Sequence, residues 1–319
     1  MKIMVVGGAG YIGSVLVPRL ISRGHDVDVI DLLWFGNNLP ELVNVIKKDI
    51  IELNEKDLEG YDQVIFLAGL SNDPMAEYSP AMNFVANGSS PAYLAYLSKR
   101  AGVKRFIYAS SCSVYGYTVN ELYDEEKPTV SNYPYGISKL QGEFAAIQLK
   151  DETFSVISLR QGTVSGYSPR MRLDLIVNTM FMNAVKGNVI TVNNPEIWRP
   201  VLAIQDAVSG YIKAVETNYS LSGIFNIASG NFTVGEVADY VKIAVKKYLD
   251  IDSEIHIKHI ADYRNYKVSI NKIMNLLSYK PLNNVDSIVK ELSDNLVRFK
   301  DFQNDKYYNI KIFSKLFPK

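Results

Sequence analysis

The stretch Gly7-Gly8-Ala9-Gly10-Tyr11-Ile12-Gly13 determines how the first half of the chain is interpreted. It follows Lys2–Val6, an apolar run that predicts a short buried strand, and it precedes a helical pattern. Three of its glycines are spaced three apart, which predicts a tight turn that brings the backbone close to a neighbouring group. The stretch therefore predicts a strand, a glycine turn and a helix in that order.

Short apolar runs of this kind alternate with helical patterns through much of the chain. The alternation predicts an α/β fold with a doubly wound parallel sheet, of the Rossmann type. The expected strands are Lys2–Val6, Asp26–Asp31, Asn44–Lys48, Gln63–Leu67, Arg105–Ala109, Phe154–Leu159 and Ile224–Ala228. The expected helices include Pro80–Ala101, Pro134–Lys150 and Thr233–Tyr248. Gly88 and Pro91 weaken the middle of the first of these helices.

The glycine turn at the start of a helix indicates a dinucleotide-binding site. Such a turn admits a diphosphate, and the helix N-terminus offers it free N–H groups. Asp31 ends the second expected strand, 18 residues after Gly13, where an acidic residue bonds the adenosine ribose hydroxyls. Since no positive charge follows directly in Leu32-Leu33-Trp34, we expect the cofactor to be NAD and not NADP. Asp49 and Ile50 follow the third strand and are expected near the adenine.

The composition of the chain limits its class. The 319 residues are 47% apolar and carry no formal net charge, which disfavours nucleic-acid binding and a membrane surface. The one cysteine, Cys112, fits a reducing compartment. No apolar run approaches the roughly 20 residues of a transmembrane helix, and glycines interrupt the signal-like start Met1–Val6. We therefore expect a cytoplasmic protein with no metal site.

The division into domains follows from the loss of regular alternation after Arg160. We expect a dinucleotide-binding domain at residues 1–165, with a return segment near residues 201–228. A smaller C-terminal substrate-binding lobe is expected within residues 166–319. The tail, residues 301–319, is either a docked helix or a mobile end.

Two segments of the first domain suggest a catalytic group. Tyr135 and Lys139 lie four residues apart, on one face of an expected helix. A tyrosine in water has a pKa of about 10, and a cationic neighbour lowers it toward the range of a useful base. The segment Ser110–Gly116 follows the fifth strand, at the sheet edge where ligands bind, so a serine there can orient a substrate oxygen.

With these motifs, the chain resembles the extended short-chain dehydrogenases/reductases, within them the nucleotide-sugar epimerase/dehydratase family. The resemblance rests on the glycine turn, the Ser110–Gly116 segment, Tyr135-Gly136-Ile137-Ser138-Lys139, and Trp198-Arg199-Pro200 followed by Asp206-Ala207-Val208. It spans about residues 2 to 295. It implies an NAD-dependent enzyme whose substrate is a nucleotide-diphosphate sugar, and a homodimer formed through the two long helices, with Tyr93, Leu97, Phe144 and Ile147 as its apolar positions.

The resemblance also assigns roles by position. It implies that Ser111, Tyr135 and Lys139 are catalytic, and that Ser111, Asn178, Arg199 and Arg264 bind the substrate, the last three at its diphosphate. Asn87 matches an asparagine near the nicotinamide ribose. The full set of expected cofactor contacts is Gly7, Gly10, Tyr11, Ile12, Gly13, Asp31, Asp49, Ile50, Leu67, Ala68, Gly69, Asn87, Tyr135 and Lys139.

Three departures from the family pattern refine the expected activity. Cys112-Ser113 stands where dehydratases carry Asp-Glu, which disfavours 4,6-dehydration. The segment that contains Gln161-Gly162-Thr163 differs from the family's usual sequence at this point, which changes the expected contact of Thr163 with the cofactor. Ser168–Asp174 is typical of a subgroup that acts on varied activated sugars and heptoses. We expect oxidation and reduction at C4 by a 4-epimerase. A 4-dehydrogenase and a 4-reductase remain alternatives, as does a non-catalytic NAD-binding scaffold, although scaffolds usually lose the tyrosine or the lysine.

Overall fold

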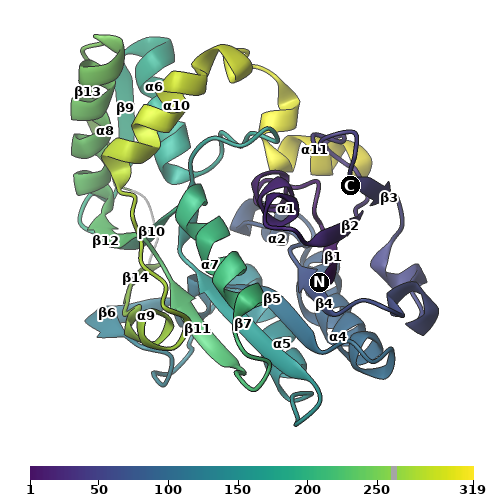
Figure 1. Ribbon diagram of the computed structural model, residues 1–319. Coiled ribbons are helices and arrows are strands. Elements are labelled where there is room, and N and C mark those ends of the chain that lie inside the picture. The colour runs from purple at the N-terminus through teal and green to yellow at the C-terminus, as the bar shows by residue number, and fades with distance from the viewer. Residues whose placement is uncertain (260–263) are drawn as a thin grey trace.

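A seven-stranded parallel sheet forms the centre of the computed structural model, which describes residues 1–259 and 264–319 (Figure 1). Its strand order is β11-β7-β5-β4-β1-β2-β3, and every neighbouring pair is parallel. The strands are β1 (Lys2–Val6), β2 (Asp26–Ile30), β3 (Asn44–Ile46), β4 (Gln63–Phe66), β5 (Arg105–Ser111), β7 (Ser155–Gln161) and β11 (Gly223–Ile227). The expected doubly wound Rossmann-type sheet is confirmed.

Helices cover both faces of this sheet because its strands are apolar on both sides. Ile3 and Val5 of β1 pack on one face in a core shared with α1 (Gly13–Ser22) and α7 (Ile204–Glu216). Met4 and Val6 point to the other face, into a core shared with α4 (Ser90–Arg100) and α5 (Pro134–Ile147). The segment near residues 201–228 thus returns to the sheet, as expected, by supplying α7 and the edge strand β11.

The C-terminal lobe has a hydrophobic core of its own (Figure 1). It is built from three helices, α6 (Ile176–Gly187), α8 (Val234–Leu249) and α10 (Val285–Phe299), packed beside short strands. The strands of the smaller sheets are β8 (Thr163–Ser165), β10 (Trp198–Ala203) and β12 (Gly230–Thr233), β9 (Val189–Asn193) with β13 (Glu254–Lys258), and β6 (Tyr117–Tyr123) with β14 (Asn265–Val268). A short helix, α9 (Asn271–Leu277), packs near β11. The division into a domain at residues 1–165 and a lobe within residues 166–319 stays a prediction.

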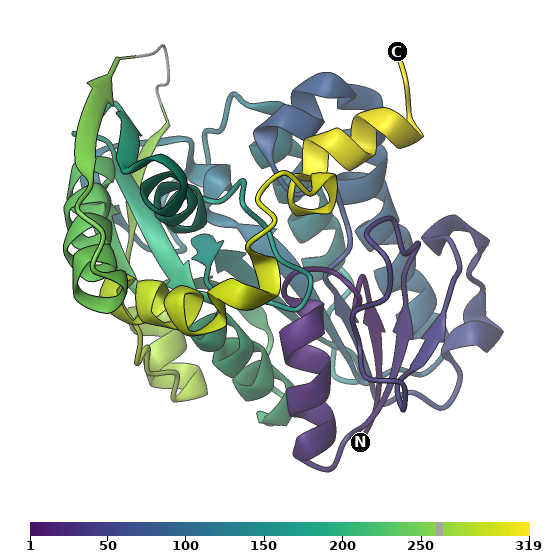
Figure 2. The ribbon, with the colours of Figure 1, turned by 90° about the horizontal axis from the view of Figure 1, so that it is seen from above.

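The C-terminal segment crosses from the lobe to the sheet domain (Figure 2). After α10 the chain runs over the top of the molecule and ends in α11 (Asn309–Leu316), which packs against α2 (Asp73–Tyr78). The tail is therefore a docked helix, one of the two alternatives that the sequence left open. Its anchor is Phe313, which is fully buried.

The long helix that begins at Pro80 contains an irregular turn. It consists of α3 (Pro80–Phe84), a π-helical turn at Val85–Ser89, and α4. Pro91 has no N–H to donate to the carbonyl of Asn87, four residues earlier. The hydroxyl of Tyr108 donates to that carbonyl instead, at 2.9 Å. The proline therefore loosens the helix where the sequence suggested, but the helix continues through it.

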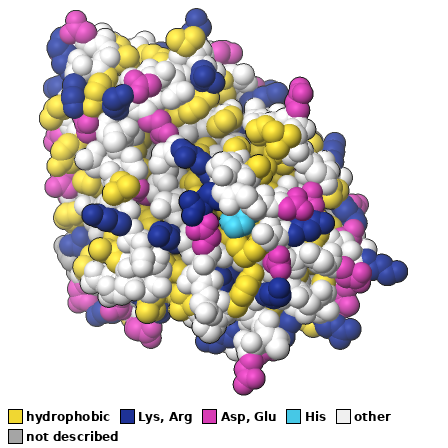
Figure 3. All heavy atoms as spheres, viewed as in Figure 1, with side chains coloured by type: hydrophobic (Ala, Val, Ile, Leu, Met, Phe, Trp, Pro, Cys, Tyr) yellow, Lys and Arg dark blue, Asp and Glu magenta, His cyan; other side chains and the backbone are white. Residues whose placement is uncertain are grey.

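The helices and the surface can be compared with the expectations on membranes and charge. No helix within the described residues is long and apolar enough to cross a membrane. On the face shown in Figure 3, acidic and basic side chains are interspersed, which matches a net charge of zero.

Candidate active site

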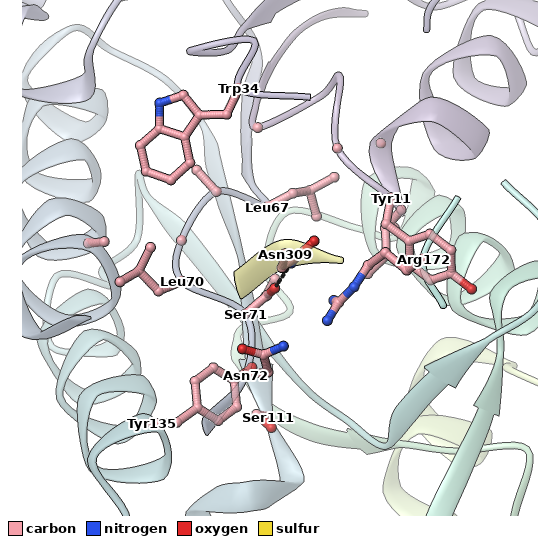
Figure 4. Close-up of a pocket in the computed structure, with 18 of the residues that line it drawn as sticks. Tyr11, Trp34, Leu67, Leu70, Ser71, Asn72, Ser111, Tyr135, Arg172 and Asn309 are labelled. Atoms are coloured by element: carbon pink, nitrogen blue, oxygen red, sulfur yellow. Dashed lines mark hydrogen bonds between the residues drawn. The ribbon is translucent and has the colours of Figure 1, made fainter. Parts of the chain in front are cut away.

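A cavity of about 960 Å³ lies between the carboxyl ends of the parallel strands and the C-terminal lobe (Figure 4). Residues at the ends of β1, β2, β4 and β5 line it, namely Gly7, Asp31, Leu67 and Ser111. Arg199 and Arg264 line it from the lobe side, and Asn309 lines it from the tail. Its volume is at the upper end of the usual range for small-molecule sites, about 300–1,000 Å³. Most of the site residues that the sequence predicts thus line one cavity, and the exceptions are Asn87, Lys139 and Asn178.

The glycine turn forms the floor of one end of this cavity. Gly7 has a φ of +81°, and a Cβ there would lie 2.5 Å from the backbone nitrogen of Ala68. The turn can therefore exist only with glycine at this position, because both its backbone angle and its neighbour exclude a side chain. Gly10, Tyr11, Ile12 and Gly13 also line the cavity, where α1 begins.

Asp31 holds the turn in place and also faces the cavity. Its carboxylate accepts hydrogen bonds from the backbone N–H of Ala9 at 3.0 Å and of Leu33 at 2.8 Å. Burial raises the pKa of Asp31, while the two backbone bonds oppose that rise. A carboxylate has about four lone-pair sites, so two of them remain for a ligand such as a ribose.

The other expected cofactor residues divide into two groups. Asp49 and Ile50, after β3, and the residues Leu67, Ala68 and Gly69, after β4, line the cavity. Asn87 and Lys139 do not; their side chains lie directly behind Gly69. Gly69 has a φ of +137°, and a Cβ there would lie 3.6 Å from the Lys139 ammonium group. The missing side chain at this position leaves the lysine close to the cavity.

The catalytic candidates meet at the other end of the cavity from Trp34 (Figure 4). Tyr135, in the first turn of α5, and Ser111, the last residue of β5, lie side by side at this end of the cavity. Lys139 lies one turn further along α5, with its ammonium group 6.0 Å from the centre of the Tyr135 ring. The expected three residues are therefore neighbours in space. β5 extends two residues beyond its expected end at Ala109, which places Ser111 on the strand and not in a loop.

A buried ion pair fixes α5 against the sheet. Glu143, one turn beyond Lys139, contacts Arg160 of β7, with 2.7 Å between Oε1 and Nη2. Both side chains are almost wholly buried. Breaking such a pair by removing one partner typically costs about 3–5 kcal/mol, so the pair holds the helix that carries Tyr135 and Lys139 in one position.

Burial sets the protonation of the catalytic candidates. It raises the pKa of Tyr135, while the nearby Ser111 hydroxyl and the charge of Arg172 lower it. Burial lowers the pKa of Lys139 to about 7. A negative charge that forms beside the lysine opposes this shift and favours the charged ammonium form.

Two arginines from the lobe lie together on the opposite wall. The Arg199 guanidinium donates to the backbone carbonyl of Arg264, and the Arg264 side chain pairs with Asp73. Both arginines line the cavity although they are 65 residues apart in sequence. A planar guanidinium can bind two anionic oxygens at once, so this wall suits a phosphate or diphosphate.

Comparison with known proteins places this geometry in a family. The family model described as the NAD dependent epimerase/dehydratase family matches residues 3–228. The chain belongs to this family. The family consists of NAD-dependent enzymes of the extended short-chain dehydrogenase/reductase type. The predicted family, the predicted enzyme class and the predicted cofactor NAD are therefore confirmed.

Individual relatives are similar along most of the chain. UDP-glucuronic acid decarboxylase 1 of Arabidopsis thaliana is 27% identical over 303 residues, which covers 88% of this chain and 66% of that protein. UDP-glucose 4-epimerase of Bacillus subtilis is 26% identical over 269 residues, or 72% of this chain and 78% of that protein. Among solved structures, UDP-glucuronic acid 4-epimerase from Bacillus cereus in complex with UDP-glucuronic acid and NAD superposes with a TM-score of 0.82. It is 22% identical and the match covers 93% of this chain and 99% of that one, which supports the fold.

The cavity fits the family's cofactor. The tight turn at Gly7 and the start of α1, which both line the cavity, suit a diphosphate, and Asp31 keeps acceptor sites for ribose hydroxyls. Trp34 lies at the end of the cavity away from Tyr135 (Figure 4), and Asp31, which also lines the cavity, precedes it by three residues. An extended dinucleotide therefore has room to lie with its adenosine at this end and its nicotinamide toward Tyr135.

Asn178, which the family pattern places at the substrate diphosphate, does not reach the cavity in this structure. Its side chain is fully buried in α6 and is not part of the lining. Its amide bonds the backbone of Gly166 and Arg172 and the hydroxyl of Tyr11. Its place here is therefore to hold the loop after β8 against the glycine turn.

Several polar residues of the lining received no individual role from the sequence, among them Asp73, Arg170, Arg172 and Asn309. The two arginines belong to the Ser168–Asp174 stretch, which marked the subgroup but gave no individual roles. Asn309 lies in the tail, whose position the sequence left open. Asn309 could not be predicted as a site residue, because the sequence does not show where the tail docks.

Proposed function

We propose that this enzyme transfers hydride between NAD and C4 of a nucleotide-diphosphate sugar, and that it is a sugar-nucleotide 4-epimerase. The observation that carries the proposal is the contact between Tyr135 and Ser111 at the cavity wall, with Lys139 behind them. This group supplies a base, a hydrogen-bond donor and a cation within one small region. The relatives named above, a UDP-glucuronic acid decarboxylase and two UDP-sugar 4-epimerases, support a UDP-sugar as substrate.

The side chains divide the work of oxidation at C4. When bound, NAD accepts hydride from C4 and can return it. Tyr135, as phenolate, takes the proton of the O4 hydroxyl as C4 loses its hydride, so that a C4 ketone forms. Ser111 donates a hydrogen bond to the same oxygen. The Lys139 ammonium group lies 6.0 Å from the centre of the Tyr135 ring, where a positive charge stabilises the phenolate.

Epimerisation then requires the ketone to turn and receive hydride on its other face. A large cavity permits such a rotation while the nucleotide stays anchored. We assign that anchor to Arg199 and Arg264, because both line the wall on the lobe side. The Arg264 guanidinium pairs with Asp73 through Nη1, and this pair orients the guanidinium on the wall.

Two other outcomes use the same groups. If the ketone leaves before hydride returns, the enzyme is a 4-dehydrogenase, and in the reverse direction it is a 4-reductase. Dehydration is disfavoured because no carboxyl group follows Ser111. Cys112 is buried, donates from Sγ to the Arg160 carbonyl at 3.1 Å, and has a pKa raised by burial. The Ser113 hydroxyl is 3.3 Å from the Tyr266 hydroxyl and supplies no acid.

Calorimetric titration with UDP tests the nucleotide part of the proposal. Wild-type protein should bind UDP, and Arg264→Ala should weaken that binding by about 10- to 100-fold, since a charge-assisted bond is lost and Asp73 is left facing the phosphates. NAD affinity should stay unchanged. Arg298→Ala, on the exposed side of α10, is the matched control. If neither UDP nor another nucleoside diphosphate binds at millimolar concentration, the sugar-nucleotide proposal fails.

A further inference from the structure

The C-terminal segment reaches the cofactor half of the cavity. Phe313 of α11 is fully buried, and its ring centre lies 5.9 Å from that of Trp34 and 5.7 Å from that of Tyr78. Phe317 lies 5.4 Å from Trp34 and lines the cavity. Since Trp34 follows Asp31 by three residues, these aromatic contacts dock the tail beside the expected adenosine site.

Asn309 is the polar residue that this docking brings into the cavity. It is 5% exposed, and its amide donates to the Ser71 hydroxyl at 2.6 Å, as Figure 4 shows. Its side-chain oxygen accepts a hydrogen bond from Nη2 of Arg170. Asn309 therefore links the loop after β4 to a guanidinium that comes from the loop after β8.

Arg170 is buried, and in the described part of the chain no carboxylate lies within ion-pair distance of it, although Asp174 and Asp31 act on it from further away. It is 4% exposed, and its guanidinium lies 3.6 Å from the centre of the Phe35 ring. The acceptors of its Nη atoms are neutral, the Asn309 amide and the Met171 carbonyl at 3.3 Å. Among described residues, its Nε has no hydrogen-bond partner and no carboxylate forms an ion pair with it. Burial lowers the pKa of Arg170 to about 9.

A buried charge of this kind calls for an anionic ligand. Removing a charge from water costs several kcal/mol unless an opposite charge or several hydrogen bonds replace the water. Arg170 lines the cavity, and Asp31 is among the groups that act on it electrostatically. At this end of the cavity, the anion that an NAD-dependent enzyme brings is the diphosphate of the dinucleotide.

We propose that Arg170 binds the diphosphate of NAD and that Asn309 is a positioning residue, which holds Arg170 there when the C-terminal helix docks. The tail thereby becomes part of the cofactor site. NAD that lies beneath it should dissociate slowly, because the tail and the loop after β4 must separate first. The proposal concerns cofactor binding, so it stands or falls independently of the sugar substrate.

Four variants test it by titration with NAD and by the rate of NAD release after dilution. Arg170→Gln should weaken NAD binding by about 10- to 100-fold, and Asn309→Ala by about 3- to 10-fold, as expected for charged and neutral hydrogen bonds. The double variant should bind NAD no more weakly than Arg170→Gln, because Asn309 acts through Arg170. Ser314→Ala, an exposed hydroxyl on the same helix, is the control and should match wild type.

Two comparisons separate this role from a merely structural one. Circular dichroism should be the same in all variants, which shows that they are folded, and their affinity for UDP should also equal that of wild type. Adenosine has no phosphate, so its affinity, measured by competition with NAD, should be the same in Arg170→Gln and in wild type. NAD affinity within twofold of wild type in both single variants would overturn the proposal. So would a loss of UDP affinity in place of NAD affinity, or an equal loss for adenosine and NAD.

Discussion

The Lys139 ammonium group donates a hydrogen bond of 3.0 Å to the backbone carbonyl of Ala109, two residues before Ser111. This bond ties α5 to β5, which carry the two residues that contact each other at the cavity wall. It also explains how a buried lysine is tolerated with little water around it. The candidate catalytic residues are therefore held together by contacts within the sheet domain, while Arg199 and Arg264 line the cavity from the lobe.

Replacing Tyr135 by phenylalanine should remove the base and leave the binding sites intact. We expect Tyr135→Phe to lower turnover on the true substrate by about 10²–10⁴-fold, the usual contribution of a general acid–base group. NAD affinity and thermal stability should change little, because the ring still fills its place. Tyr96→Phe, at an exposed position of α4, is the control. Near-normal turnover in Tyr135→Phe would contradict the assigned mechanism.

Replacing Lys139 by methionine should stabilise the cofactor-free protein while inactivating the enzyme. Burial lowers the pKa of Lys139 from 10.5 to about 7, so the folded state binds this proton less readily than the unfolded state. The resulting penalty is largest below about pH 7 and disappears as the pH rises toward the unfolded pKa. The stability gain of Lys139→Met, on the order of 1–3 kcal/mol, should follow the same course.

Chemical denaturation of both proteins across this pH range measures that gain. Lys150→Met, just beyond the end of α5 and exposed, should show no comparable pH-dependent gain. If the difference in free energy of unfolding between Lys139→Met and wild type grows as the pH rises, the charged lysine does not destabilise the folded protein as we expect.

Asp31 should decide between NAD and NADP. Its carboxylate faces the expected ribose and would repel a 2′-phosphate, so wild type should bind NAD far more tightly. We expect Asp31→Ser to narrow that preference by about tenfold or more, since the repulsion is lost and Arg170 lies within electrostatic reach. Asp26→Ser, at the exposed start of β2, is the control. Equal affinities for the two cofactors in wild type would remove Asp31 from this role.

The expected homodimer through the two long helices remains a prediction. Of the four apolar positions named for it, Tyr93 and Phe144 are 41% and 45% exposed, while Leu97 is buried in the core of the sheet domain. Ile147 is only partly exposed. Light scattering at micromolar concentration should give a dimer, and Phe144→Glu should give a monomer. A wild-type monomer at that concentration would exclude this interface.

The sequence predicts those parts of the fold whose signals are local. The glycine turn, Asp31 and the Tyr135–Lys139 spacing each lie within one strand–turn–helix unit, so pattern and chemistry agree over a few residues. The π-helical turn is partly foreseeable, since Pro91 lacks an N–H. The Tyr108 hydroxyl, which donates to the freed Asn87 carbonyl, comes from β5 and could not be foreseen from the helix sequence.

Contacts that depend on long-range packing were not predictable. The bond from Arg170 to Asn309 joins residues 139 apart and exists only because α11 docks on α2. Asn178 illustrates the opposite case, because a family position alone suggested a ligand contact. In the structure, its amide forms hydrogen bonds with the backbone of the neighbouring loop. A polar group that is already hydrogen-bonded within the protein is not available to a ligand, and the sequence does not show which groups these are.

The most direct measurement is NADH absorbance after rapid mixing of the NAD-loaded enzyme with nucleotide-diphosphate sugars, beginning with UDP-glucose and UDP-glucuronic acid. With the true substrate we expect NADH to appear, up to about one equivalent per active site, and then to decay as the C4 epimer forms. Tyr135→Phe should bind the same sugar and form no NADH. If bound nucleotide sugars never reduce the cofactor in wild-type enzyme, hydride transfer at C4 is contradicted.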